Sequence, residues 1–241
     1  MDVEKKRILQ KLFAEFLASF IFGFAVYSAI LNTKSDSPTS GTTVGLTVCF
    51  AGISLIYTFC DHTISHFNPA LTFATIITGK LDPIMGTGYI IVQLIGFFLA
   101  SILCVVCFPY DYMDTLKFIT ASKASDNISN INLFFEEFSL SFILAFVAFE
   151  VGVNAIREPG VTLFVNEPQV DRSKLAPLTI GFTLGFLAFL ASTTSGGAFN
   201  PGLVFGPAIA SGDFTYFWIF ITSELTGALL GALVQVFILF K

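Results

Sequence analysis

Six long apolar stretches limit the possible folds of this chain more than any other feature. A helix needs about 20 apolar residues to cross the hydrocarbon of a bilayer. Such stretches occur at roughly 12–31, 41–60, 84–107, 134–155, 175–194 and 215–240. Because lipid offers no partners for backbone polar groups, stretches of this kind form helices. The sequence therefore predicts an all-α membrane protein with six transmembrane helices.

The composition agrees with a membrane location. Charged residues are 12% of the 241 residues, whereas about a quarter is usual for a soluble domain. The net charge of −5 argues against a nucleic-acid partner. We find no constellation of a nucleophile, a base or metal ligands, so we expect no enzymatic activity, no cofactor and no metal site.

Lys and Arg residues predict the orientation, because they accumulate in cytoplasmic loops. With six spans both termini lie on one side, which then holds nine of the 12 Lys and Arg residues. We therefore expect both termini in the cytoplasm, in a membrane that the sequence does not identify. The outer loop 108–132 carries Asn127 in a glycosylation sequence, which matters if that face reaches a secretory lumen. The inner loop 157–174 is either an inert linker or a gate.

The second half of the chain repeats landmarks of the first half in the same order. They are a glutamate that opens a Phe-rich run, an Asn-Pro pair and a polar residue three places before a glycine: Glu15 and Glu137, Asn68 and Asn200, Gln93 and Glu224. We interpret residues 1–120 and 121–241 as two copies of one unit with three spans each. Because three is odd, the second copy enters the membrane from the opposite side. Inverted repeats place the functional site near the midplane, between the halves.

Each unit also contains an apolar segment that is too short to cross the bilayer, at 68–79 and 200–211. About 11 residues at 1.5 Å each give roughly 16 Å, or half of the hydrocarbon thickness. Both segments begin with Asn, a preferred N-cap, and then Pro, which suits the first helical position. We expect two re-entrant half-helices whose N-termini meet near the centre of the bilayer.

Two N-termini in this position predict a pore that selects by charge. Each helix N-terminus carries about half a positive charge and unpaired N–H donors. Together they would repel cations and hydronium, while the amides of Asn68 and Asn200 bond a neutral oxygen. The alternative is that each Asn-Pro pair marks an ordinary turn. Two instances at matching repeat positions favour the pore.

These motifs resemble those of the aquaporin and aquaglyceroporin superfamily of major intrinsic proteins. The resemblance covers nearly the whole chain and rests on Glu15, Asn68-Pro69-Ala70, Gln93, Glu137, Asn200-Pro201-Gly202 and Phe205-Gly206-Pro207-Ala208. It implies a right-handed, inverted-repeat bundle with one pore per protomer, assembled in the bilayer as a homotetramer. The implied permeants are water and small uncharged solutes such as glycerol, urea, ammonia or peroxide.

The resemblance also implies roles for individual polar residues. Glu15 and Glu137 would accept hydrogen bonds from the backbone of the loops that hold the half-helices, although a proton relay is the alternative. Gln93 is a further structural residue, and Glu224 matches it in the second half. His66 would lie at the pore mouth, either as a hydrogen-bonding residue of the loop or as a pH gate.

The second motif departs from the family pattern. Gly202 stands where the family usually has Ala, and Leu203 stands where it usually has an Arg that lines the outer constriction. Without that guanidinium, the exclusion of protons and cations would depend on the half-helix ends alone.

The resemblance assigns the other constriction positions to Ala188, to Gly197 and to a residue between Val48 and Phe50. The constriction would then be lined by small, apolar and uncharged residues, unless Phe50 fills it. Such a ring either admits solutes larger than water, or dewets and slows conduction.

A passive channel is the function that we expect, and two other classes stay open. Inverted repeats and broken helices also occur in secondary transporters, and Glu224 would supply an ion-coupling site if it faced the pore. A membrane scaffold or adhesion protein with a closed pore is the other alternative.

Overall fold

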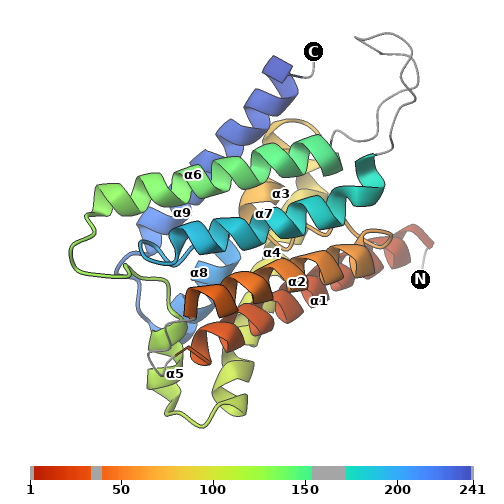
Figure 1. Cartoon of the computed structure of the whole chain (residues 1–241). Helices are drawn as coiled ribbons and strands as arrows, with labels where there is room; N and C mark the ends of the chain where they lie inside the picture. The colour runs from red at the N-terminus through yellow and green to blue at the C-terminus, as the bar shows by residue number, and fades with distance from the viewer. Residues whose placement is uncertain (1–2, 34–39, 154–171, 240–241) are drawn as a thin grey trace.

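The computed structural model describes residues 3–33, 40–153 and 172–239, and within these ranges it is helical without strands (Figure 1). The α-helices are α1 (Val3–Leu31), α2 (Ser40–Phe59), α3 (Pro69–Ile77), α4 (Pro83–Cys107), α5 (Tyr112–Ile119), α6 (Asn130–Ala148), α7 (Ala176–Ala191), α8 (Pro201–Ser211) and α9 (Phe217–Leu233). Short π-helical turns, η1 (Phe149–Val153) and η3 (Val234–Leu239), extend α6 and α9, and a 3₁₀ turn, η2 (Arg172–Leu175), precedes α7. The all-α fold class is confirmed.

Five of the described helices are long and apolar enough to cross a membrane: α1, α2, α4, α6 with η1, and α9 with η3. The sixth expected span, α7, has 16 residues and is lengthened at its start by η2. Helix α1 begins at Val3, well before the expected start at residue 12, because its basic first turns are also good helix formers.

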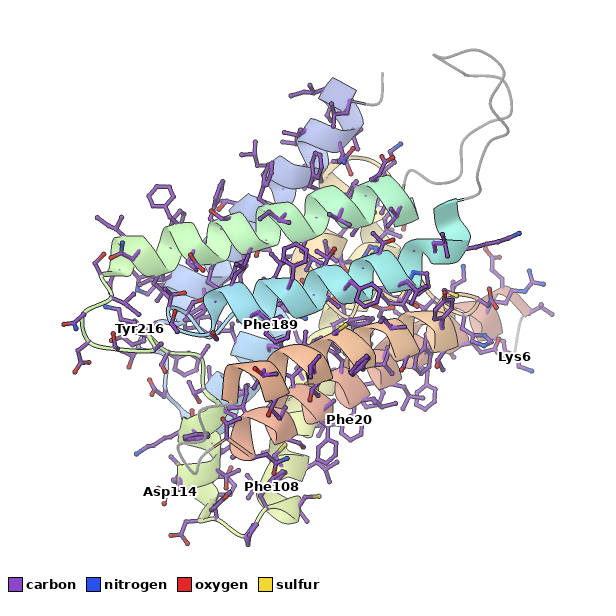
Figure 2. The ribbon with its side chains drawn as sticks, in the orientation of Figure 1. Lys6, Phe20, Phe108, Asp114, Phe189 and Tyr216 are labelled. Atoms are coloured by element: carbon purple, nitrogen blue, oxygen red, sulfur yellow. The ribbon has the colours of Figure 1, made fainter. Side chains whose placement is uncertain are left out.

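Helix α5 was not expected, because the sequence analysis treated 108–132 as a polar loop. It is eight residues long and buries the side chains of Thr115, Leu116 and Ile119. Figure 2 places Lys6 at one end of the bundle and Asp114 and Tyr216 towards the other. Which end faces the cytoplasm stays a prediction. Residues 157–171 of the inner loop 157–174, the expected linker or gate, lie outside the described residues.

Matching helix pairs pack closely in the two halves. Helix α1 packs on α4, and α6 packs on α9. At Gly96 of α4 an added Cβ would lie 2.8 Å from the Phe16 carbonyl oxygen, and at Gly227 of α9 it would overlap the Phe138 carbonyl. Small residues let the helix backbones approach this closely. The resulting van der Waals contacts hold the helices together, because lipid provides no hydrophobic force between them. The division of the chain at residue 120 itself stays a prediction.

The two short helices α3 and α8 lie among the longer ones (Figure 1). They have nine and 11 residues, close to the expected half-helices. Gly212 caps the C-terminus of α8 with a φ of 73°, which a glycine adopts without strain. Their buried N-terminal turns bring both asparagines to the interior of the bundle.

Candidate pore between the half-helices

The half-helices α3 and α8 begin in the same way. Asn68 and Asn200 are extended N-caps with φ/ψ of −152°/110° and −158°/104°. The Asn68 Oδ1 accepts a hydrogen bond from the Ala70 N–H at 2.9 Å, and the Asn200 Oδ1 accepts one from the Gly202 N–H at 3.0 Å. A proline at the first helical position follows each cap. Each segment thus presents the positive end of a helix dipole at its asparagine.

The asparagine amides cross-link the two half-helices. Asn68 Nδ2 donates to the Phe199 carbonyl at 2.9 Å, and Asn200 Nδ2 donates to the Phe67 carbonyl at 2.9 Å. Each asparagine therefore bonds the residue that precedes the other one. Because an amide group has two N–H hydrogens, each asparagine keeps one beyond this cross-link.

Buried carboxylates hold the strained residues that precede both asparagines. Phe67 and Phe199 have positive φ values of 31° and 32°, a backbone state that costs on the order of 1–3 kcal/mol each. The Phe67 N–H donates to Glu15 Oε1 at 2.6 Å, and the Phe199 N–H donates to Glu137 Oε2 at 2.7 Å. Hydrogen bonds to a charged acceptor offset part of this strain. The contacts are those that a structural strut would make.

A polar network surrounds Glu15 in the first half. Gln93 Nε2 donates to Glu15 Oε1 at 2.8 Å and to Thr72 Oγ1 at 2.9 Å, and Thr63 Oγ1 donates to Glu15 Oε2 at 2.8 Å. His66 is half-buried, and its Nδ1 lies 3.2 Å from Thr72 Oγ1. The ring therefore has a hydrogen-bond partner within the loop, and the pH-gate alternative stays untested.

A cavity of about 400 Å³ reaches from one end of the bundle to the second half-helix. Its walls include three of the predicted constriction residues, Leu203, Ala188 and Gly197. The segment after α5 forms another wall and contributes Lys123, the one Lys or Arg among the described residues that line this cavity.

Phe50 was considered as a residue that would fill the constriction, and the structure places it elsewhere. Val48 is buried in the same apolar cluster as Ala188 and Leu203, but the cavity wall from α2 consists of Val44, one turn away, and Gly41. Phe50 is 59% exposed and does not line the cavity, so it does not fill the constriction. Two residues turn an α-helix by about 200°, which puts Phe50 on the face opposite Val48.

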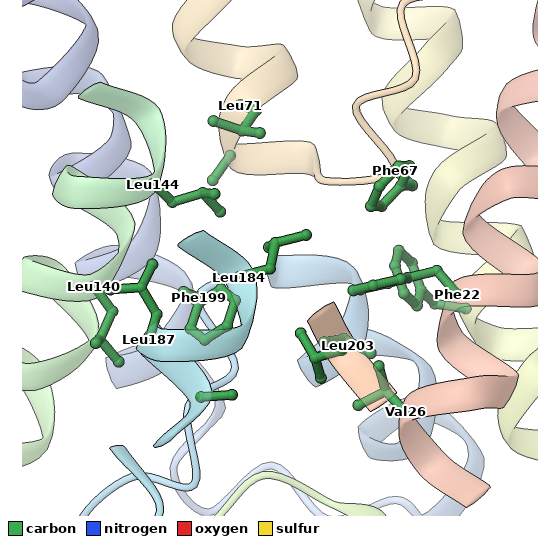
Figure 3. Close-up of a cluster of buried hydrophobic side chains, with 14 of the residues drawn as sticks. Phe22, Val26, Phe67, Leu71, Leu140, Leu144, Leu184, Leu187, Phe199 and Leu203 are labelled. Atoms are coloured by element: carbon green, nitrogen blue, oxygen red, sulfur yellow. The ribbon is translucent and has the colours of Figure 1, made fainter. Parts of the chain in front are cut away.

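Apolar side chains surround the ends of the half-helices (Figure 3). Leu203 lies beside Val26 of α1. Phe22 packs against Phe67 with ring centroids 4.8 Å apart. A permeant near the asparagines would therefore meet apolar walls and the two amide groups.

The packing of α4 explains why Gly202 replaces the usual alanine of the motif. An added Cβ at Gly202 would overlap the ring of Phe97, which is fully buried. On the other side of the ring, a Cβ at Gly23 would lie 2.8 Å from Phe97 Cδ1. The Phe97 ring thus occupies the space of the missing methyl group.

Several residues of the site were missed by sequence reasoning. Tyr27 donates its hydroxyl to the Leu203 carbonyl at 3.0 Å, and Thr63 bonds Glu15. These contacts join residues far apart in the chain, as does the contact between Phe97 and Gly202, and no local motif marks them. Nothing in the sequence around Lys123 marks it as a residue that lines a cavity.

The model of the family described as "Major intrinsic protein" matches residues 2–235. The chain belongs to the major intrinsic protein family. It is 70% identical to an aquaporin of Enterocytozoon bieneusi, over 100% of both chains. It is 34% identical to Aquaporin-B of Dictyostelium discoideum, over 98% of this chain and 86% of that one.

The fold also matches a solved structure of the family. The X-ray structure of the aquaglyceroporin from Plasmodium falciparum superposes with a TM-score of 0.73 over 97% of each chain, at 19% sequence identity. The predicted family resemblance is confirmed. Together with the long apolar helices, family membership identifies an integral membrane channel of the aquaporin type, from a family of transporters rather than enzymes.

Proposed function

We propose that this aquaporin-family chain is a passive channel for water and small neutral solutes, with its path running past Asn68 and Asn200. The reciprocal bonds between these asparagines and the carbonyls of Phe199 and Phe67 carry the proposal. They hold two positive helix ends at one point, so a cation on the path meets both. The remaining amide N–H groups bond a neutral oxygen and replace part of its hydration.

The outer constriction determines which solutes pass. It consists of Leu203, Ala188 and Gly197, with Val44 or Val48 as the fourth wall. None of these side chains is charged, and two are small. They leave room for glycerol or urea but give hydroxyl groups no guanidinium to bond. Water and larger neutral solutes should therefore both permeate.

The transporter alternative has less support. An ion-coupling site needs paired acids that open onto the path. Glu224, the candidate acid, is fully buried and is not among the residues that line the outer cavity. We further propose the homotetramer that is typical of the family, with both termini in the cytoplasm.

Osmotic shrinkage of proteoliposomes tests the proposal. Stopped-flow light scattering would compare sucrose, glycerol and urea as osmolytes, with empty vesicles as the reference. We expect faster shrinkage in sucrose than in empty vesicles, and rapid re-swelling in glycerol or urea. Rates equal to those of empty vesicles would rule out a channel and leave the closed-pore scaffold.

A variant at the constriction tests the solute ranking. Leu203→Arg should reduce glycerol and urea flux more than water flux, because a long charged side chain narrows the passage. Leu203→Met is the matched control, since it keeps an apolar side chain of similar volume. An unchanged ratio of glycerol to water flux in Leu203→Arg would show that Leu203 does not line the constriction.

A further inference from the structure

Helix α9 carries a carboxyl group that the pore mechanism does not use. Glu224 lies in the middle of α9 and is 0% exposed. Neither of its carboxyl oxygens has a hydrogen-bond partner among the described residues. A buried ionised carboxylate without partners is strongly disfavoured, so this side chain requires an explanation.

The carboxyl group of Glu224 faces another acid. The Glu137 carboxyl and the backbone N–H of Asn200 lie close to the Glu224 carboxyl, the first as an acid and the second as a donor, but neither contact meets the geometry of a hydrogen bond. No Lys, Arg or His among the described residues acts on Glu224. On α6, Glu136 adds a further negative charge near Glu137. Within the described part of the chain, the surroundings of Glu224 thus contain acids and no compensating cation.

The first half of the bundle shows what stands at the matching position. Gln93 on α4 is also 0% exposed, and its Nε2 donates to Glu15 Oε1 at 2.8 Å. In sequence Gln93 and Glu224 occupy the same place, each three residues before a glycine. Glu15 therefore receives a hydrogen bond from a neutral amide, whereas Glu137 faces an acid.

The hydrogen bonds of Glu137 decide which of the two acids is ionised. Glu137 accepts from the Ala198 N–H at 3.0 Å and from the Phe199 N–H at 2.7 Å. Donors to a carboxylate favour its ionised form. Glu224 accepts no formed hydrogen bond and has only the Asn200 N–H nearby. Two adjacent buried carboxylates without a cation among the described residues cannot both be charged. One proton on the pair therefore belongs on Glu224.

We propose that Glu224 is a neutral carboxylic acid whose O–H donates to the Glu137 carboxylate, and that it positions the loop before Asn200 as Gln93 positions the loop before Asn68. Glu224 acts through Glu137, which holds Phe199 and, through it, the cap of α8. It does not touch a permeant and is not an ion-coupling site. Its consequence for permeation rests on the proposed function, but the protonation and the hydrogen bond do not.

Two substitutions separate this role from other roles of Glu224. Glu224→Gln keeps the shape and a donor, as Gln93 does in the first half. Glu224→Leu keeps the volume but removes the donor. Gln93→Leu is the matched variant in the first half, where it removes the donor to Glu15. The purified full-length protein is measured by infrared spectroscopy in H₂O and D₂O, and its melting temperature is measured in parallel.

The wild type should show the carbonyl stretch of a protonated carboxylic acid, shifted in D₂O, and this band should be lost in Glu224→Gln. The melting temperature of Glu224→Gln should stay close to that of the wild type. Glu224→Leu and Gln93→Leu should each melt about 3–10 °C lower, because each leaves a buried carboxylate short of a donor.

Three results would overturn the proposal: no acid band in the wild type, the same band in Glu224→Gln, or equal destabilisation by Gln and Leu at position 224. If Glu224→Leu does not fold, the comparison of the wild-type and Glu224→Gln spectra still shows whether Glu224 is protonated. Neither readout measures transport, so this proposal can fail while the channel proposal stands, and the reverse.

Discussion

The contact between Gly202 and Phe97 predicts that restoring the usual alanine of the motif destabilises this chain. An alanine methyl at position 202 would overlap the Phe97 ring. The ring cannot retreat freely, because Gly23 faces its other edge so closely that a Cβ there would lie 2.8 Å from Cδ1. In a close-packed interior such a clash displaces neighbouring groups.

The expected magnitude follows from two opposing terms. Overpacking a buried site costs about 1–3 kcal/mol, whereas Gly→Ala in a helix gains up to about 1 kcal/mol. Because the added methyl overlaps several atoms of the Phe97 ring, the cost lies in the upper part of its range, about 2–3 kcal/mol. The net loss for Gly202→Ala is therefore about 1–2 kcal/mol, or a melting temperature lower by roughly 2–8 °C for a chain of this length.

A double-mutant cycle gives the assay. The melting temperatures of wild type, Gly202→Ala, Phe97→Leu and the double variant are measured on purified protein. Phe97→Leu makes room for the methyl group. The loss in free energy of unfolding of the double variant should therefore be smaller than the sum of the two single losses by about 0.5–3 kcal/mol. Gly152→Ala is the control, because its added Cβ would meet Ile180 at 3.8 Å and no other described residue within 4 Å. Additive effects, or a Gly202→Ala protein as stable as the wild type, would show that the Phe97 ring does not exclude a methyl group at position 202.

Two further substitutions test the site. Tyr27→Phe removes the hydroxyl that donates to the Leu203 carbonyl. It should lower the free energy of unfolding by about 1–3 kcal/mol and change the ratio of glycerol to water flux. An unchanged melting temperature would show that this bond contributes nothing to stability. Asn68→Ala removes both the cap of α3 and the bond to the Phe199 carbonyl. It should cost about 1–3 kcal/mol and raise proton leak in proteoliposomes, and a leak equal to that of the wild type would contradict the role assigned to the asparagine.

Features with a local signal were predictable from the sequence. The half-helices are marked by Asn68 and Asn200, each followed by proline and an apolar segment of half the needed length. The caps form through bonds within three residues, so no tertiary information was needed. The apolar spans were predictable for the same reason, since length and composition alone decide whether a helix can cross a bilayer.

Features that depend on the rotation of a helix or on distant partners were not predictable. Helix α2 is apolar on both its lipid and core faces, so its pattern could not show that Phe50 points outwards while Val44 faces the cavity. Helix α5 is too short for its periodicity to be recognised. The contact of Gly202 with Phe97 required the packing of α4 on α8.

In the proposed pore, the two positive helix ends that meet at Asn68 and Asn200 let water pass and exclude protons. Simultaneous recording of water flux and of internal pH in the same proteoliposomes, under an osmotic and a proton gradient, tests it most directly. We expect water flux well above that of empty vesicles, with proton flux equal to theirs. Proton flux that rises together with water flux, or water flux no faster than in empty vesicles, would contradict it.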